Sequence, residues 1–178
     1  MLAAMTTFEN TWDDEYLDDD TFDDDTFADD DDFDDFDDGP VPVPPPGTLL
    51  CTDEDVREHV LALVGPERDG PRALWVLFLD DTDRALPLVI PINDLPTIAD
   101  HAMVTNLATI LRTLVDENAP GGCVVFGLVR RAGGDRGSYE AGWSAALREA
   151  MATVGLPVRA IVAIGRERSR VLPVDRAG

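Results

Sequence analysis

The residues best placed to do chemistry lie in one loop, between an apolar run and a helical pattern. The stretch CVVFGLVRRAGGDRGSYEAGWSAALREAM, residues 123–151, predicts a buried strand, a glycine-rich loop and an amphipathic helix. Sites are often built at such a junction, because the strand's carboxyl end and the helix's unpaired N–H groups converge there. The loop holds several arginines but neither histidine nor cysteine. Its charge therefore favours binding of an anion.

The candidate site is a set of arginines around the start of the predicted helix. Their positive charge and the helix's N–H groups would act on an anion in the same direction. A solvated, charged loop without a ligand is the alternative interpretation. The serine beside them either caps the helix or contributes to the site. With the arginines of the closing segment, the predicted anion- or partner-binding residues are Arg130, Arg131, Arg136, Ser138, Arg166, Arg168 and Arg170.

The sequence predicts no catalytic residue, no metal ligand and no cofactor. A nucleophile needs a base within hydrogen-bond reach and a third group that orients the base. The two histidines, His59 and His101, lie in other predicted helices among charged residues, so we expect both at the surface. The run GGDRGS lacks the lysine of a phosphate-binding P-loop. The two cysteines are expected to act as small buried apolar side chains without a chemical role.

Composition favours a cytoplasmic protein. Two cysteines, Cys51 and Cys123, make no disulfide framework. No segment approaches the apolar length of a membrane span, and the first residues lack the pattern of a signal peptide. All 14 basic residues are arginine, which together with abundant Ala, Gly and Pro indicates a GC-rich bacterial genome. We expect no direct nucleic-acid binding, because the arginine-rich half lacks lysine and interleaved aromatics.

Residues 1–39 form an acidic tail that holds 18 of the 36 acidic residues and no basic one. Such dense like charge predicts disorder. Aromatic residues recur between the acids, a pattern typical of segments that bind basic, partly apolar surfaces. A solvated tail with incidental aromatics is the alternative. Without a partner, we expect the tail to dock on the arginines of its own domain. Its predicted interaction aromatics are Trp12, Tyr16, Phe22, Phe27, Phe33 and Phe36.

A proline-rich linker, residues 40–48, separates the tail from a folded domain at 49–175. Its prolines favour an extended, semi-rigid spacer, although a ligand for a proline-recognition domain would look the same. The domain's patterns predict the order α-β-β-α-β-α-β-β, a layered α/β fold. Pro87 and Pro91 predict that the second strand lies at a sheet edge.

Three side chains are expected to fix the helices of this domain. Thr52 and Asp100 are suited to cap the first two helices, and Trp143 is expected inside the core on the third. The apolar stripe of the second helix is predicted to comprise Met103, Leu107, Ile110, Leu111 and Leu114.

The sequence resembles the RadC branch of the JAB (MPN/JAMM) domain family. The resemblance is carried by VLFLDDTDRALPLVI as a hairpin and by the run from VVFGLVRRAGGDRG to SRVLPV. It covers most of the folded part and rests on element order, on the GGD of the loop and on the spacing from the helix to G-x-P. It implies a JAB-like fold with strands, a long helix and a loop that carries the motif H-x-H-P-S-G-D-x-x-P-S-x-x-D.

The sequence departs from the family at the zinc site. The resemblance implies two histidines and an aspartate as zinc ligands and a glutamate that activates the bound water. Here the histidine positions fall on Val129 and Arg131, and the aspartate position falls on Gly142 or, shifted by one, on Ala141. The glutamate would lie near Pro87 or Leu88. We therefore predict a degenerate member without zinc.

Three functional hypotheses follow. The leading one is a non-catalytic, RadC-like protein of the bacterial cytoplasm that acts as a binding or scaffolding module. The second is a regulator whose acidic–aromatic tail mimics nucleic acid and occupies a basic protein partner. The third is an enzyme with chemistry that the sequence does not reveal. Deletion of the tail discriminates the first two, since only the second loses partner capture.

Overall fold

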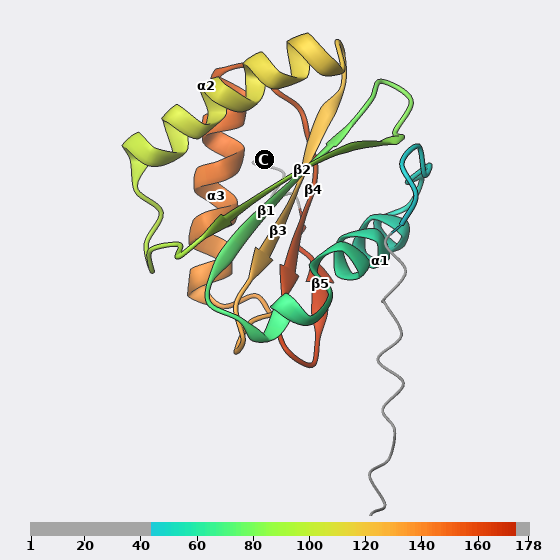
Figure 1. Cartoon of the computed structure of the whole chain (residues 1–178). Helices are drawn as coiled ribbons and strands as arrows, with labels where there is room; N and C mark the ends of the chain where they lie inside the picture. The colour runs from blue at the N-terminus through green and yellow to red at the C-terminus, as the bar shows by residue number, and fades with distance from the viewer. Residues whose placement is uncertain (1–43, 174–178) are drawn as a thin grey trace, which may run out of the picture. The chain divides into compact units, whose positions relative to one another are not determined.

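A computed structural model describes residues 44–173 of the chain as one mixed α/β domain (Figure 1). The tail 1–39, linker residues 40–43 and residues 174 and 175 of the predicted domain lie outside the described residues. The elements follow the expected order α-β-β-α-β-α-β-β, with a short 3-10 helix added. They are α1 (Asp53–Val64), η1 (Gly65–Asp69), β1 (Ala73–Leu79), β2 (Ala85–Asn93), α2 (His101–Asn118), β3 (Cys123–Val129), α3 (Ser138–Thr153), β4 (Val158–Ile164) and β5 (Ser169–Val171).

The five strands form one sheet in the order β2-β1-β3-β4-β5. Only β3 and β4 pair in parallel; the other neighbours are antiparallel. Helix α3 makes the crossover between the parallel strands. The carboxyl ends of β3 and β4 therefore meet at one end of the sheet, which brings the loop after β3 beside the turn after β4.

Helices cover both faces of the sheet, with α2 and α3 on one face and α1 on the other (Figure 1). Each face has its own apolar core. Strand β1 contributes to both, because successive side chains of a strand point to opposite faces. Leu74, Val76 and Phe78 pack towards α2 and α3, whereas Trp75 and Leu77 pack towards α1. This burial on both faces explains the continuous apolar run of β1.

The predicted helix starts are confirmed for the first two helices. The Thr52 side chain accepts a hydrogen bond from the Asp55 N–H, and the Asp55 side chain accepts one from the Thr52 N–H. The Asp100 side chain accepts from the Met103 N–H in the same way. Side chains thus satisfy N–H groups that have no partner inside the helix. The location of Trp143 is also confirmed, since it is 1% exposed.

The predicted stripe of α2 is right for Leu111, which is buried, and for Met103, Leu107 and Leu114, which pack half-buried against the core, but it is wrong for Ile110. The helix buries Val104, Ala108, Leu111 and Val115, which are four, three and four residues apart. Ile110 is 57% exposed on the outer side. Two overlapping apolar stripes run along this helix, and the fold buries the one that contains the small Ala108. Packing beside α3 decides between them, which a periodicity cannot do.

Strand β2 lies at the edge of the sheet, as its prolines predicted. The described end of the linker is bound to this edge: the Gly47 N–H donates to the Ala85 carbonyl at 2.8 Å. The Ala85 N–H donates to the Thr48 carbonyl at 2.9 Å. Gly47 and Thr48 are therefore hydrogen-bonded to the domain.

His59 is buried, which contradicts the expected surface position. It is 7% exposed on α1 and lines a hollow with Pro44–Pro46 and Pro87. Burial lowers the pKa of its imidazole. The linker prolines cover a histidine that its own helix would leave in solvent.

Among the described residues, no helix has the length and apolarity needed to cross a membrane.

Candidate functional site

The loop after β3 and the turn after β4 are joined by backbone hydrogen bonds. The Arg130 N–H donates to the Ile164 carbonyl at 3.0 Å, and the Arg166 N–H donates to the Arg131 carbonyl at 3.1 Å. Pairing of the parallel strands thus continues beyond their ends. The loop 130–137 and the turn 165–168 consequently form one surface.

Glycines permit close contact between the two segments. An ideal Cβ on Gly134 would lie 2.2 Å from the Arg168 carbonyl oxygen, and Gly134 has a φ of +86°. A Cβ on Gly165 would lie 2.2 Å from the Gly133 carbonyl oxygen. Only glycine allows such an approach, and glycine adopts positive φ without strain. These contacts hold the loop and the turn in one arrangement.

A third segment, the 3-10 helix η1 that follows α1, also binds the turn. The guanidinium of Arg68, in η1, donates through Nε and Nη2 to the Gly165 carbonyl at 3.1 and 2.9 Å. Two N–H donors that converge on one carbonyl oxygen fix the guanidinium relative to the turn. The turn that carries Arg166 and Arg168 is therefore held by side chain and backbone together.

Arg130 is half-buried and paired with a buried carboxylate, so its guanidinium does not face an open site. Its Nη2 donates to the Glu140 Oε1 at 2.7 Å, and Nε donates to the same oxygen at 3.1 Å. Its guanidinium also lies over the Tyr139 ring, 5.1 Å from the ring centre. The Glu140 side chain is 1% exposed, and a carboxylate this deep needs a cationic partner. The prediction of Arg130 as an anion-binding residue is therefore not supported by its contacts.

The Glu140 carboxylate is closely enclosed. A Cβ on Gly137 would lie 2.6 Å from Oε2, and one on Gly133 would lie 3.1 Å from Oε1. Oε2 is buried and has no hydrogen-bond partner among the described residues. A carboxylate enclosed in this way is out of reach of a substrate, so we assign Arg130 and Glu140 a structural role.

Ser138 does not cap α3, contrary to the first interpretation of this residue. The N-cap is Gly137, one residue earlier, and no side chain bonds to the N–H groups there. Ser138 is the first helical residue and is exposed. The acidic residue in the first turn is Glu140, whose charge interacts favourably with the positive end of the helix dipole.

The remaining predicted arginines divide between two surfaces. Arg131, Arg166 and Arg168 line, together with Glu167, a shallow hollow of 390 Å³ between the loop and the turn, and we call these three arginines the arginine rim. Arg168 pairs with Asp135 at 2.9 Å, and Arg166 contacts an aspartate of η1 at 3.4 Å. Arg170 is exposed on β5.

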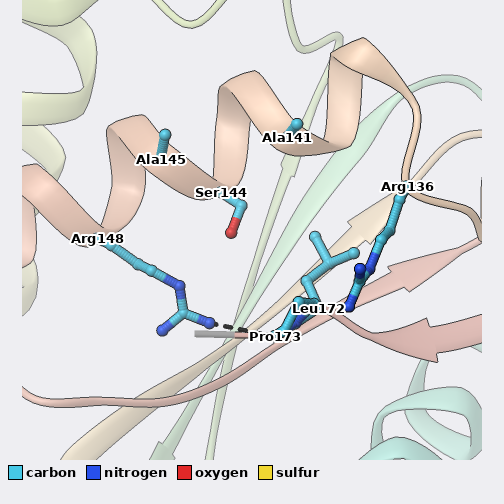
Figure 2. A pocket seen from close by; sticks show the side chains of 7 residues that line it. All are labelled: Arg136, Ala141, Ser144, Ala145, Arg148, Leu172 and Pro173. Atoms are coloured by element: carbon cyan, nitrogen blue, oxygen red, sulfur yellow. Dashed lines mark hydrogen bonds between the residues drawn. The ribbon is translucent and has the colours of Figure 1, made fainter. Parts of the chain in front are cut away.

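Arg136 lies on a different surface, between α3 and β5. There it lines a hollow of 270 Å³, which we call the α3–β5 groove (Figure 2). The structure therefore keeps three of the seven predicted residues together and places Arg136 apart. The groove is lined by Arg136, Ala141, Ser144, Ala145, Arg148, Leu172 and Pro173.

Within residues 44–173, no three histidine, cysteine, aspartate or glutamate side chains gather as metal ligands would. Burial and the nearby charge of Asp83 raise the pKa of the Cys123 thiol to about 11. Cys123 is thus protonated at neutral pH and a poor nucleophile. The tail aromatics Trp12, Tyr16, Phe22, Phe27, Phe33 and Phe36 lie outside the described residues.

Sequence reasoning missed several residues that shape these surfaces. The sequence gives a weak indication of the role of Glu140, because an acid in the first turn of a helix follows a basic loop. Arg68 had none, because it lies 97 residues from the carbonyl that it binds. In the sequence, Ser144 and Arg148 look like ordinary helix positions. Only the folded domain shows that they lie beside the residues that follow β5.

Comparisons with protein-family models, with curated proteins and with solved structures found no match to this chain.

Proposed function

We propose that this chain acts by binding and not by catalysis, as a degenerate RadC-like JAB-fold module. The element order from α1 to β5 supports this proposal, because the resemblance implies the same order. So does the identity of the residues at the implied ligand positions. Val129 is an apolar core residue, and Gly142 has no side chain to offer a metal.

The ion pair between Arg130 and Glu140 is the observation that carries the proposal. It joins the end of β3 to the first turn of α3. In the family that the sequence resembles, zinc ligands come from the same two elements. Here a cation and a carboxylate supplied by the chain make the connection. The link needs no metal, and it leaves no open coordination position where a substrate could bind.

The arginine rim is the binding surface under this proposal. Arg131, Arg166 and Arg168 are exposed, whereas the backbone beneath them is held by Gly134, Gly165 and Arg68. Guanidinium groups bind carboxylates in a planar, two-pronged geometry. A rigid backbone reduces the entropy lost when a partner binds. We therefore infer a protein partner with an acidic surface.

Charge reversal in the full chain tests this function. Tagged wild type would be cross-linked to its partner in the host cytoplasm and compared with the double variant Arg131→Glu, Arg168→Glu. The matched control is Arg112→Glu, which reverses an arginine on α2 that pairs within its own helix. We expect at least a tenfold loss of the captured partner in the double variant and less than a twofold change in the control. Equal loss in both variants would reject the arginine rim as the surface.

The second candidate function is regulation by the tail, which the acidic–aromatic sequence of residues 1–39 supports. Under it, the tail occupies a basic protein in place of nucleic acid. A chain that lacks residues 1–39 would then capture no partner, whereas the rim variant would still capture one. The two variants therefore separate the two functions.

A further inference from the structure

Helix α2 carries two apolar rows, and the domain buries only one of them. The buried row is Val104, Ala108, Leu111 and Val115. The second row is Met103, Leu107, Ile110 and Leu114, of which three are half-buried and Ile110 is 57% exposed. Arg112 donates through Nη1 to the Gly155 carbonyl at 3.1 Å, so the Arg112 side of α2 faces the end of α3. Because a helix turns by about 100° per residue, the second row lies on the flank away from α3.

Strand β2 extends this apolar flank. Every second residue of the strand points to the face of the sheet that α2 and α3 cover, and these residues are half-buried against the same core. They are Leu86, Leu88, Ile90 and Ile92. Helix α3 packs on β4, so α2, beside it, covers the side of the sheet that ends at the edge strand β2 (Figure 1). We call the second row of α2 and the row of β2 together the α2–β2 face.

The α2–β2 face carries no charge on either row. From residue 85 to residue 111 the only acidic side chains are those of Asp94 and Asp100, and the only other titratable one is that of His101. Asn106, which is exposed beside the second row, is polar but neutral. A charged partner would lose hydration at this face without meeting an opposite charge. A second copy of the chain would instead bring the same neutral surface.

The spacing of the second row is symmetric. From Met103 to Leu114 the steps are four, three and four residues, which read the same in both directions. This is also the spacing by which two helices pack side by side. A two-fold axis between Leu107 and Ile110 would therefore place the row on itself, with Met103 opposite Leu114 of the second copy. Two-fold dimers that use the same patch on both subunits are the commonest oligomers.

The size of the face fits a reversible dimer. Helix α2 has 18 residues, so its flank is about 27 Å long and about 10 Å wide. The nine residues of β2, at about 3.3 Å each, add a strip about 30 Å long. Together the two strips offer about 500 Å², which is close to the roughly 600 Å² per partner at the lower limit of specific interfaces. We therefore expect pairing that depends on concentration.

We propose that the α2–β2 face is a dimer interface, in which α2 packs antiparallel to α2 of a second copy. Ile110 then lies at the centre and loses its exposure to water. Pro87 and Pro91 oppose pairing of the two edge strands, so the dimer is held by side chains. At each end, Glu117 of one copy approaches Asp100 of the other, and like charges meet at the border of the interface. The inference does not rest on the proposed function, but a dimer would present two arginine rims to an acidic partner.

Sedimentation velocity of the full chain over a range of concentrations tests the proposal. We expect a monomer–dimer equilibrium that strengthens as salt rises, because salt screens the repulsion between two chains of net charge −22 and leaves apolar contacts intact. Ile110→Asp places a charge at the centre of the interface and should weaken the dimer at least tenfold. The matched control, Thr109→Asp, adds the same charge at an exposed position about 100° away around the helix and should change the dissociation constant less than twofold.

Disulfide formation tests the antiparallel arrangement. One copy carries Met103→Cys and the other Leu114→Cys, both in a chain with Cys51→Ser and Cys123→Ala. Antiparallel helices bring the two new thiols together, so a mixed disulfide should form. Identical positions would be about 16 Å apart along the helices, which is too far for a disulfide. Disulfides that form mainly between identical copies would overturn the proposal.

Thermal unfolding first verifies that each variant folds like the parent chain. A chain that stays monomeric at the highest concentration, or a dimer that weakens with salt or persists in Ile110→Asp, would overturn the proposal. So would a monomeric chain in which Ile110→Asp abolishes binding of a different protein, because that protein would then be the occupant. If no dimer forms but the double variant Arg131→Glu, Arg168→Glu still loses its partner, this inference fails and the proposed function stands.

Discussion

Two arginine–carboxylate pairs, each with one partner in the loop after β3, have nearly equal lengths but different environments. Arg130 and Glu140 approach to 2.7 Å, and Arg168 and Asp135 approach to 2.9 Å. The side chains of the first pair are 32% and 1% exposed, and those of the second are 66% and 43% exposed. Distance alone does not distinguish them. Burial does, because water competes for the charges of the outer pair and not for Glu140.

The comparison explains how one arginine-rich loop has two roles. The inner pair connects β3 to α3. If it opened, the buried Glu140 carboxylate would lose its cationic partner without gaining contact with water. The outer pair can exchange Asp135 for the carboxylate of a partner at little cost. A basic loop is therefore not a uniform anion site. Its inner arginine is structural, and its outer arginines are available for recognition.

Removal of the inner cation should have the largest effect. Arg130→Gln leaves the Glu140 carboxylate buried without a positive partner, and such a loss typically costs about 3–5 kcal/mol of the free energy of unfolding. Urea unfolding at neutral pH measures the change. Arg131→Gln, one residue later and exposed, is the control and should change the free energy by less than about 0.5 kcal/mol. Equal values for the two variants would contradict the division into inner and outer arginines.

A substitution in the backbone frame should come next. Gly134→Ala forces a side chain into a positive-φ position, which costs about 1–2 kcal/mol, and against the Arg168 carbonyl, where overpacking costs roughly 1–3 kcal/mol more. Gly142→Ala is the matched control, because its Cβ meets nothing within 4 Å in the middle of α3. Alanine there should stabilise the protein by about 0.5–1 kcal/mol. The change in melting temperature should therefore be negative for Gly134→Ala and positive for Gly142→Ala. Changes of the same sign would contradict the role of the Gly134 contact in stabilising the loop.

Removal of the inner carboxylate should cost less than removal of its cation. Glu140→Gln loses a charged hydrogen bond, worth about 1.5–3 kcal/mol, but the Arg130 side chain is 32% exposed and can reach water. The free energy of unfolding should therefore fall less than in Arg130→Gln. The reverse order would mean that the arginine, and not the carboxylate, is the more costly group to leave unpaired.

Breaking the outer pair should have the smallest effect. Arg168→Gln should lower the free energy of unfolding by only about 0.2–1 kcal/mol, as for other exposed ion pairs. In 1 M salt, where the screening length is about 3 Å, the difference from wild type should vanish. A cost that persists at high salt would show that Arg168 stabilises the loop by packing.

Features with a local cause could be predicted from the sequence. Thr52 and Asp100 cap helices because each bonds to a backbone group three residues away. The prolines of β2 predict an edge strand because a proline has no N–H wherever it lies. The apolar runs of β1 and β3 predict buried strands for a similar reason. In each case a short window contains both the cause and the effect.

Features that depend on distant partners could not be predicted in this way. Which loop arginine pairs with a buried carboxylate depends on Glu140, ten residues later, and on the glycines that enclose it. The burial of His59 depends on linker prolines that fold back onto α1. The exposure of Ile110 depends on which of two stripes α2 turns towards the sheet. The N-cap at Gly137 rather than Ser138 follows from the path of a loop that is held against the turn after β4.

The two prolines of the edge strand affect how this protein behaves in solution. A free sheet edge is a template on which another chain can add a strand, and this is a common route to aggregation. Pro87 and Pro91 have no N–H to offer such a strand, and Gly47 and Thr48 already occupy the bonds at Ala85. At the opposite edge, β5 comprises only three residues and carries the exposed Arg170. Both edges thus resist strand addition, which favours a colloidally stable protein at the high concentrations used for structural work.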